Sequence, residues 1–270
     1  MKLFSSSVRY LLFIIILFAG SLFCQTINDS ELRKVETLGR QLYEYDMACW
    51  VASDSLMASN PDQSTLGTFL AARENGIWKV GFGRLSDNSD SFLLFHEAVY
   101  SPKENTCKVT SFKEPQKNTG FYFNAAKALE KMFAAVKPEA PPYNFAIIPA
   151  GKDNLYLYFY PAQASYSTYR FGGDTRYTYS IKSNSITDTL TLHKTILNMP
   201  YVKDKTQEIN GTFSTAIMTS IPVETDILYV LSRKFPAQHY VSTEKWVFII
   251  TPDGKITKFP ADKFKELGTK

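Results

Sequence analysis

Residues 29–58, DSELRKVETLGRQLYEYDMACWVASDSLMA, carry the pattern that decides the fold. Apolar side chains return at every third or fourth position, as they do on one face of an α-helix. Asp29 or Ser30 can cap the start of this helix, and Asn60-Pro61 ends it. The apolar stripe consists of Val35, Leu38, Leu42, Tyr45, Cys49, Ala52 and Leu56. We expect the helix to lie across a β-sheet, although its seven-residue repeat also permits a coiled-coil seam with a partner.

A β-hairpin is predicted directly after this helix. Glu74-Asn75-Gly76 separates two strand-like segments, residues 65–72 and 77–85, and Asn-Gly is the strongest short signal for a hairpin turn. Residues 91–100 and 106–112 predict two further strands. The spacing of apolar residues then becomes helical again over residues 119–136.

The rest of the chain is mostly strand-like. Residues 143–216 contain several short β-segments separated by turn signals, residues 224–233 predict a short helix, and strands and a last helical turn follow. We therefore predict the α+β class: mainly antiparallel β-sheet, with a long N-terminal amphipathic helix and a second helix packed on it. Residues 25–270 form a single domain in this interpretation, and a proline-rich segment at 138–143 could divide it into two lobes.

Residues 1–24 have the layout of a secretory signal peptide. Two basic residues precede an apolar run at 10–19, and small residues follow, with cleavage expected after Ser21 or Cys24. An uncleaved membrane anchor is the alternative, since the extended run approaches the length that spans a bilayer. Lipidation is less well supported, because Phe23 stands where a lipoprotein carries a small residue. We expect a periplasmic or extracellular protein with no membrane span after signal cleavage.

Composition excludes several classes of protein. A hydrophobic content of 44% with 21% charged residues is ordinary globular usage, and a formal net charge of +4 without a basic stripe argues against nucleic-acid binding. Two cysteines remain after cleavage at residue 24. In an oxidising compartment Cys49 and Cys107 could form a disulfide, or Cys49 could be a small buried hydrophobe.

No motif for catalysis, cofactor binding or metal binding is evident. The histidines are His96, His193 and His239, and none has a second histidine or a cysteine at the spacing of metal ligands. We therefore predict no metal and no cofactor. A hydrolase would need a carboxylate to share a cleft with one of these histidines. The carboxylates considered are Glu97, Glu224 and Asp226.

Tyrosine alternation is the most distinctive surface signal. In the segment LYLYFY, residues 155–160, a period of two places three tyrosines on one face of a strand. Phenol rings beside guanidinium groups could bind a sugar, a peptide or an anionic ligand. The candidate ligand-binding residues are Tyr156, Tyr158, Tyr160, Arg170, Arg176 and Tyr177. The alternative is a tyrosine face that a helix covers.

The segment Pro222–Ile227 resembles the tail of the zinc-peptidase signature of JAMM/MPN domains. The resemblance would make Asp226 a zinc ligand, but residues 211–216 lack the histidines of that signature, which implies an inactive relative. Acidic residues at 224 and 226 also simply favour the N-terminus of a helix.

A looser resemblance spans most of the chain. Leu42–Trp50, Gly172–Tyr177 and Pro222–Asp226 are similar to segments of uncharacterised secreted proteins of Gram-negative bacteria. This resemblance implies export but no particular activity. We therefore predict an exported protein with a non-catalytic binding or interaction role, whose partner is a small ligand or an envelope protein. The alternatives are a hydrolase and an envelope assembly protein that uses the apolar stripe as its contact surface.

Overall fold

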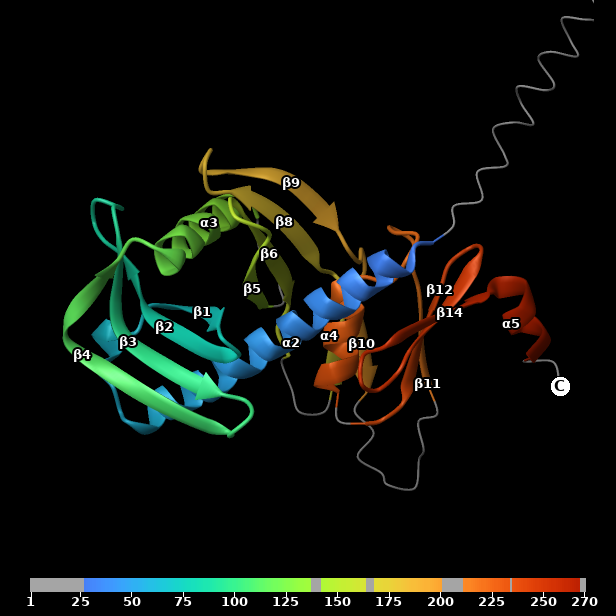
Figure 1. Cartoon of the computed structure of the whole chain (residues 1–270), viewed down its shortest axis with the longest axis horizontal. Coiled ribbons are helices and arrows are strands. Elements are labelled where there is room, and N and C mark those ends of the chain that lie inside the picture. The colour runs from blue at the N-terminus through green and yellow to red at the C-terminus, as the bar shows by residue number, and fades with distance from the viewer. Residues whose placement is uncertain (1–26, 137–141, 164–167, 201–210, 234, 268–270) are drawn as a thin grey trace, which may run out of the picture.

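The structure, a computed structural model, describes residues 27–136, 142–163, 168–200, 211–233 and 235–267. The fold is α+β with mainly antiparallel sheets, as predicted (Figure 1). The signal peptide and most of the predicted lobe boundary lie outside the described residues. In the part of the chain that is described, no helix is both long and apolar enough to cross a membrane.

Four α-helices and one 3₁₀ turn are present among the described residues: α2 (Asp29–Ala58), η1 (Gln63–Thr65), α3 (Phe121–Ala135), α4 (Glu224–Ser232) and α5 (Ala261–Leu267). The strands are β1 (Thr68–Glu74), β2 (Ile77–Leu85), β3 (Phe92–Ser101), β4 (Thr106–Asn118), β5 (Tyr143–Pro149), β6 (Asn154–Pro161), β7 (Thr168–Phe171), β8 (Thr175–Ser180), β9 (Ser185–Thr191), β10 (Leu197–Pro200), β11 (Gly211–Thr215), β12 (Gln238–Ser242), β13 (Trp246–Ile250) and β14 (Ile256–Pro260).

The strands form three four-stranded sheets and one ribbon. The sheet β1-β2-β3-β4 and the sheet β5-β6-β8-β9 are antiparallel throughout, and β7 pairs with β10. In the sheet β11-β12-β13-β14, the strands β11 and β12 are parallel. Parallel neighbours need a crossover connection, and α4 lies in that connection.

Helix α2 begins and ends as predicted, but a different residue caps it. The Asn28 side chain accepts a hydrogen bond from the Ser30 N–H at 2.9 Å, so neither Asp29 nor Ser30 is the cap. All seven residues of the predicted apolar stripe are buried. The stripe therefore belongs to the core and is not a surface for an assembly partner.

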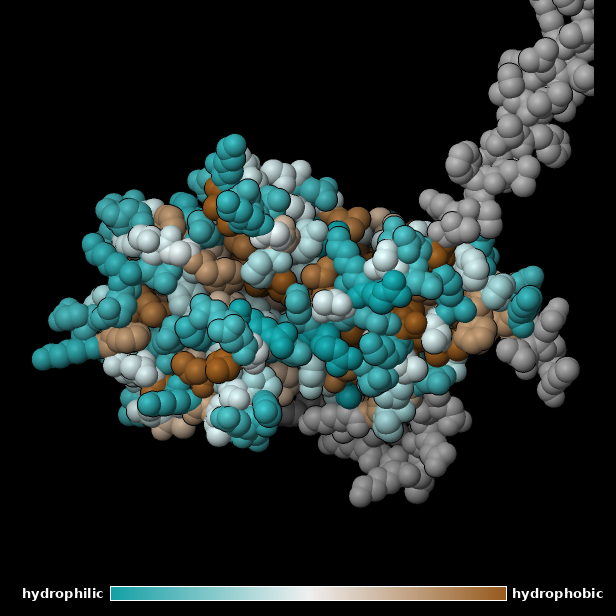
Figure 2. All heavy atoms as spheres, viewed as in Figure 1, coloured by the Kyte–Doolittle hydropathy of each residue, from teal (hydrophilic) through white to brown (hydrophobic). Residues whose placement is uncertain are grey.

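The first two sheets are covered by a different helix on each face. In β6, Tyr158 and Tyr160 pack on the α2 side, whereas Leu155 and Leu157 pack on the α3 side. Both sets are buried because successive side chains of a strand point to opposite faces. The core on the α3 side contains residues from both before and after the segment 138–143 in the sequence, so the two parts of the chain share one core. Figure 2 shows mainly hydrophilic residues on the visible outer surface, with the hydrophobic ones in small groups.

A third core cluster lies at the N-terminal half of α2. Leu32 and Val35 of α2 pack there with Ile227 of α4 and Phe248 of β13. The two helices cross closely at Gly39, where an added Cβ would lie 2.6 Å from the carbonyl oxygen of Glu224. One helix therefore contacts all the sheets that position the site described below (Figure 1).

The proposed Cys49–Cys107 disulfide is absent, since both thiols are free. Cys49 is buried on α2, and burial raises the pKa of its thiol well above the usual value. Because the thiolate is the reactive species, we expect Cys107 of the native protein to alkylate first and Cys49 only on unfolding. Mass spectrometry after timed iodoacetamide treatment measures the order. A disulfide-linked peptide in unreduced protein would contradict this prediction.

Candidate functional site

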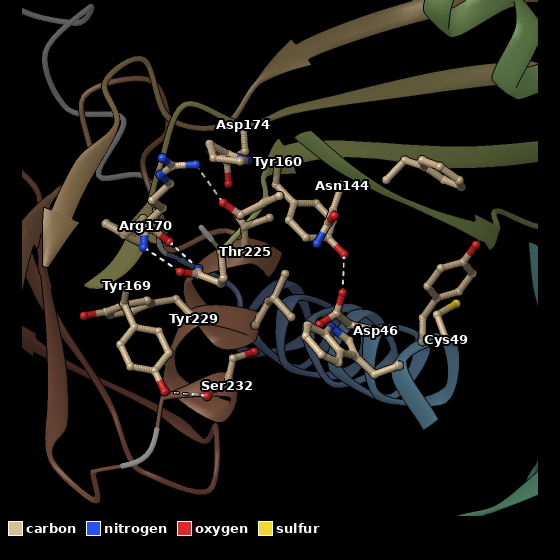
Figure 3. Close-up of a pocket in the computed structure, with 18 of the residues that line it drawn as sticks. Asp46, Cys49, Asn144, Tyr160, Tyr169, Arg170, Asp174, Thr225, Tyr229 and Ser232 are labelled. Atoms are coloured by element: carbon tan, nitrogen blue, oxygen red, sulfur yellow. Dashed lines mark hydrogen bonds between the residues drawn. The ribbon is translucent and has the colours of Figure 1, made fainter. Parts of the chain in front are cut away.

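A pocket of about 360 Å³ opens between α2, β5, β6, β7 and α4 (Figure 3). Pockets of a few hundred cubic ångströms with apolar walls and a few fixed polar groups are typical small-molecule sites. The aromatic side chains of its wall include Tyr45, Trp50, Phe69, Phe145, Tyr160 and Tyr229. Its polar residues include Asp46, Asp54, Asn144, Arg170, Asp174 and Thr225.

Asp46 is the carboxylate that α2 presents to this pocket. Its side chain is half-buried, and Oδ1 accepts a hydrogen bond from the Tyr160 hydroxyl at 3.0 Å (Figure 3). Burial raises the pKa of Asp46, and the Tyr160 hydrogen bond only partly opposes that rise. Asp46 forms no ion pair with any described basic residue. The ionised Asp46 carboxylate is therefore partly desolvated, and no described basic residue neutralises its charge.

Arg170 lies on a different side of the pocket from Asp46 (Figure 3). Its guanidinium donates to the Ala162 carbonyl at 3.0 Å, and its backbone exchanges two hydrogen bonds with the Gln163 side chain. These contacts fix Arg170 and the chain segment at 162–163 together. Arg170 therefore helps to hold this part of the pocket wall in place.

Asp174 is positioned by the two glycines that precede it. Gly172 and Gly173 both have positive φ, at +81° and +69°, a conformation that glycine adopts without strain. The chain then turns so that Asp174 is buried and its Oδ1 lies 2.8 Å from Nδ1 of His193. The turn at residues 172–174 therefore places the Asp174 carboxylate in the pocket wall.

Asp226 completes a buried cluster behind the pocket wall. Its Oδ2 accepts the Val223 N–H at 2.8 Å and so caps α4, as the acidic start of that helix favours. Its Oδ1 lies 3.2 Å from Nε2 of His193 and 3.8 Å from Nε2 of His239. His193 therefore lies between two carboxylates, those of Asp174 and Asp226.

The electrostatics of the cluster keep His193 protonated. Burial disfavours the imidazolium, but the two carboxylates outweigh burial and raise the pKa of His193 to about 10. For Asp226, burial opposes ionisation, yet the two histidines lower its pKa below the usual range. At neutral pH the cluster is therefore an imidazolium held by two carboxylates.

His239 is held by the hydroxyls of β11. Its Nδ1 lies 2.8 Å from Thr212 Oγ1, and its Nε2 lies 3.0 Å from Ser214 Oγ. These hydroxyls stand on the strand where the JAMM/MPN signature would carry histidines. Within the described ranges, no group of three or more His, Cys, Asp or Glu is arranged to hold a metal ion.

The predicted tyrosine surface is divided by the register of the strands. Tyr158 pairs with Arg176, but Tyr177 pairs with Leu157 and so faces the α3 side. Arg176 stacks over Tyr156 at 4.6 Å and binds Glu224 at 2.5 Å. Of the six candidates, only Tyr160 and Arg170 line the pocket.

Glu97 and His96 do not form a site together, because neighbouring strand residues point to opposite faces. His96 lies between Thr65 Oγ1 at 2.7 Å and Ser111 Oγ at 2.8 Å, whereas Glu97 accepts from the Tyr122 hydroxyl at 3.2 Å. His96 is thus a hydrogen-bonded structural residue.

The sequence did not indicate most of the pocket wall, and the residues missed include Asp46, Trp50 and Asp174. The first two stand four positions apart on α2, a spacing that places side chains on one helical face. The third follows Gly172-Gly173, which the sequence indicates as a turn and as part of the resemblance segment Gly172–Tyr177, but not as a binding site.

Comparisons with protein-family models, with curated proteins and with solved structures found no match to this chain.

Proposed function

We propose that this protein is an exported binding protein that takes a small organic molecule into the pocket between α2, β6, β7 and α4. The observation that carries the proposal is a pocket of about 360 Å³ that eight aromatic side chains help to line. Its unpaired Asp46 and its Arg170 lie on different sides of that space. Aromatic walls supply binding area, and fixed charged groups supply orientation.

Hydrolysis is the second candidate, because Asp226 does lie beside His193 and His239. A general base near neutral pH needs a free nitrogen and a pKa near the working pH. Both nitrogens of His193 face carboxylates, and its pKa is raised to about 10. His239 and Asp226 are almost fully buried. The cluster therefore suits the support of the pocket wall better than proton transfer.

Filling the pocket tests the proposal. We expect Ser53→Trp, on the pocket-facing side of α2, to abolish binding without unfolding the protein. A ligand at 100 times its Kd stabilises a protein by about 2.7 kcal/mol, which is roughly 5–10 °C in Tm for this size. A thermal-shift screen of small molecules should yield compounds that stabilise the wild type and not Ser53→Trp.

Met57→Trp is the matched control, because Met57 is an exposed residue of the same helix and does not line the pocket. It should keep the ligand response of the wild type. Compounds that shift all three proteins equally, or a screen without any stabilising compound, would argue against a ligand pocket here.

A further inference from the structure

We propose that the pocket selects an organic cation, whose ammonium group lies against Asp46 and the indole of Trp50. This inference rests on the proposed function, because it names the class of ligand for the same pocket. It starts from three residues of α2 that line the pocket at spacings of four: Asp46, Trp50 and Asp54. Residues four apart on a helix are neighbours on its surface, so an indole stands between two carboxylates.

Asp46 is the group that a ligand cation would neutralise. Its only hydrogen bond among the described residues comes from the Tyr160 hydroxyl, which leaves Oδ2 available to the pocket. A carboxylate in a partly desolvated site gains much more from a cation than one in water does, because the local dielectric is low. Asp54 likewise forms no ion pair with a described residue, and it is exposed at the same wall.

The aromatic residues suit the same cation. Trp50 is 52% exposed, so its ring is free to contact a ligand, and tryptophan is the best aromatic partner for a cation. Tyr45, Phe69 and Phe145 line the pocket from α2 and the neighbouring strands. Ring faces attract ammonium groups and also accept the apolar body of a ligand. Carboxylates beside rings therefore favour an amine over a neutral molecule of equal size.

The other charged groups of the pocket do not reverse this preference. The charge of Asp174 is balanced by His193 at 2.8 Å. Arg170 donates to the Ala162 carbonyl and lies on a different side of the pocket from Asp46. The α2 wall therefore keeps two uncompensated carboxylates, and we expect the cationic end of the ligand to point toward α2.

Three probes of similar size and different charge test the inference: 2-phenylethylamine, 2-phenylethanol and 3-phenylpropanoate. Isothermal titration calorimetry at pH 7 should give the amine a Kd at least ten-fold lower than that of the alcohol, and the acid should bind most weakly. In Asp46→Asn, which keeps an acceptor for Tyr160, the amine should lose about ten-fold and the alcohol little. Asp54→Asn should weaken the amine two- to three-fold.

Asp188→Asn is the matched control, because Asp188 is exposed on β9 and lies outside the pocket. It should leave all three affinities unchanged. The unliganded Asp46→Asn variant should have a Tm at least equal to that of the wild type, since an uncompensated charge has been removed. A lower Tm would instead indicate that Asp46 serves stability.

The outcomes separate this inference from the proposed function. Equal affinities for amine and alcohol, both lost in Ser53→Trp, would overturn the cation preference and leave the pocket as a ligand site. If the acid bound most tightly, the cation preference would be wrong, and Arg170 would be the charged group that selects the ligand. If no probe binds while the screen yields an uncharged pocket ligand, only the cation inference falls. If neither the probes nor the screen gives a ligand, both fall.

Discussion

Replacing Gly39 with alanine is expected to destabilise the protein by about 2–3 kcal/mol, the scale of overpacking in a close interface. Helix propensity predicts the opposite sign, because alanine in a helix is more favourable than glycine by about 1 kcal/mol. The new Cβ would lie 2.6 Å from the Glu224 carbonyl oxygen and would also collide with Cβ of Ile227. Both obstacles are backbone or backbone-near atoms, so α2 and α4 must move apart. Urea unfolding followed by circular dichroism measures the change.

Gly120→Ala is the control for this substitution. A Cβ at Gly120 would lie 3.7 Å from its nearest described neighbour, the side-chain oxygen of Asn118, so we expect a change below about 1 kcal/mol, the size of a cap effect. If Gly39→Ala were more stable than the wild type, the close crossing of α2 and α4 would be wrong. The same variant should also weaken ligand binding, because α4 carries Thr225 and Tyr229 into the pocket.

Replacing His193 with glutamine is expected to cost about 3–5 kcal/mol at pH 6, since it leaves two buried carboxylates without their cation. The loss should depend on pH. The pKa of His193 is raised from 6.5 to about 10, so its contribution is fully present below pH 6.5 and disappears as pH rises toward 10. The stability difference between wild type and His193→Gln should therefore shrink across that window. Urea unfolding at pH 6, 8 and 10 measures it.

His96→Gln is the matched control for the pH dependence. Among the described residues, His96 has only hydroxyl partners, and burial lowers its pKa, so it is neutral throughout the window from 6.5 to 10. Its replacement should cost less, and the cost should not change with pH. A His193→Gln effect that stays constant from pH 6 to 10 would show that His193 is not an imidazolium in the folded protein.

Much of the fold could be predicted from local patterns. The bounds of α2, the hairpin at Asn75-Gly76 and the acidic start of α4 all follow from periodicity, turn chemistry and helix capping. The α+β class follows from these elements together. What local patterns do not contain is the pairing of distant strands, such as the parallel contact of β11 with β12.

The candidate site was harder to predict for a physical reason. Residues 155–160 alternate in β6 as predicted, but alternation does not say whether a helix covers a face. The sequence therefore left Tyr158 either on a ligand-binding face or under a helix, and it is buried on the α2 side. Tyr177 was placed beside the wrong neighbours because strand register decides the face, and a single sequence does not give register. Asp226 and His193 are 33 positions apart, and only the tertiary fold brings them together.

Helix α2 also has a consequence for the order of folding. Its first turns are held by residues more than 200 positions later: Ile256 donates its N–H to Glu36 at 2.7 Å, and Arg40 donates to the Asp253 carbonyl at 2.5 Å. A chain emerges from the ribosome N-terminus first, so Leu32 and Val35 in the first turns of α2 are made long before their core partners Ile227 and Phe248. Contacts of such separation slow folding. We expect refolding to be slow and prone to aggregation, and nascent chains that stop before residue 250 to need a chaperone.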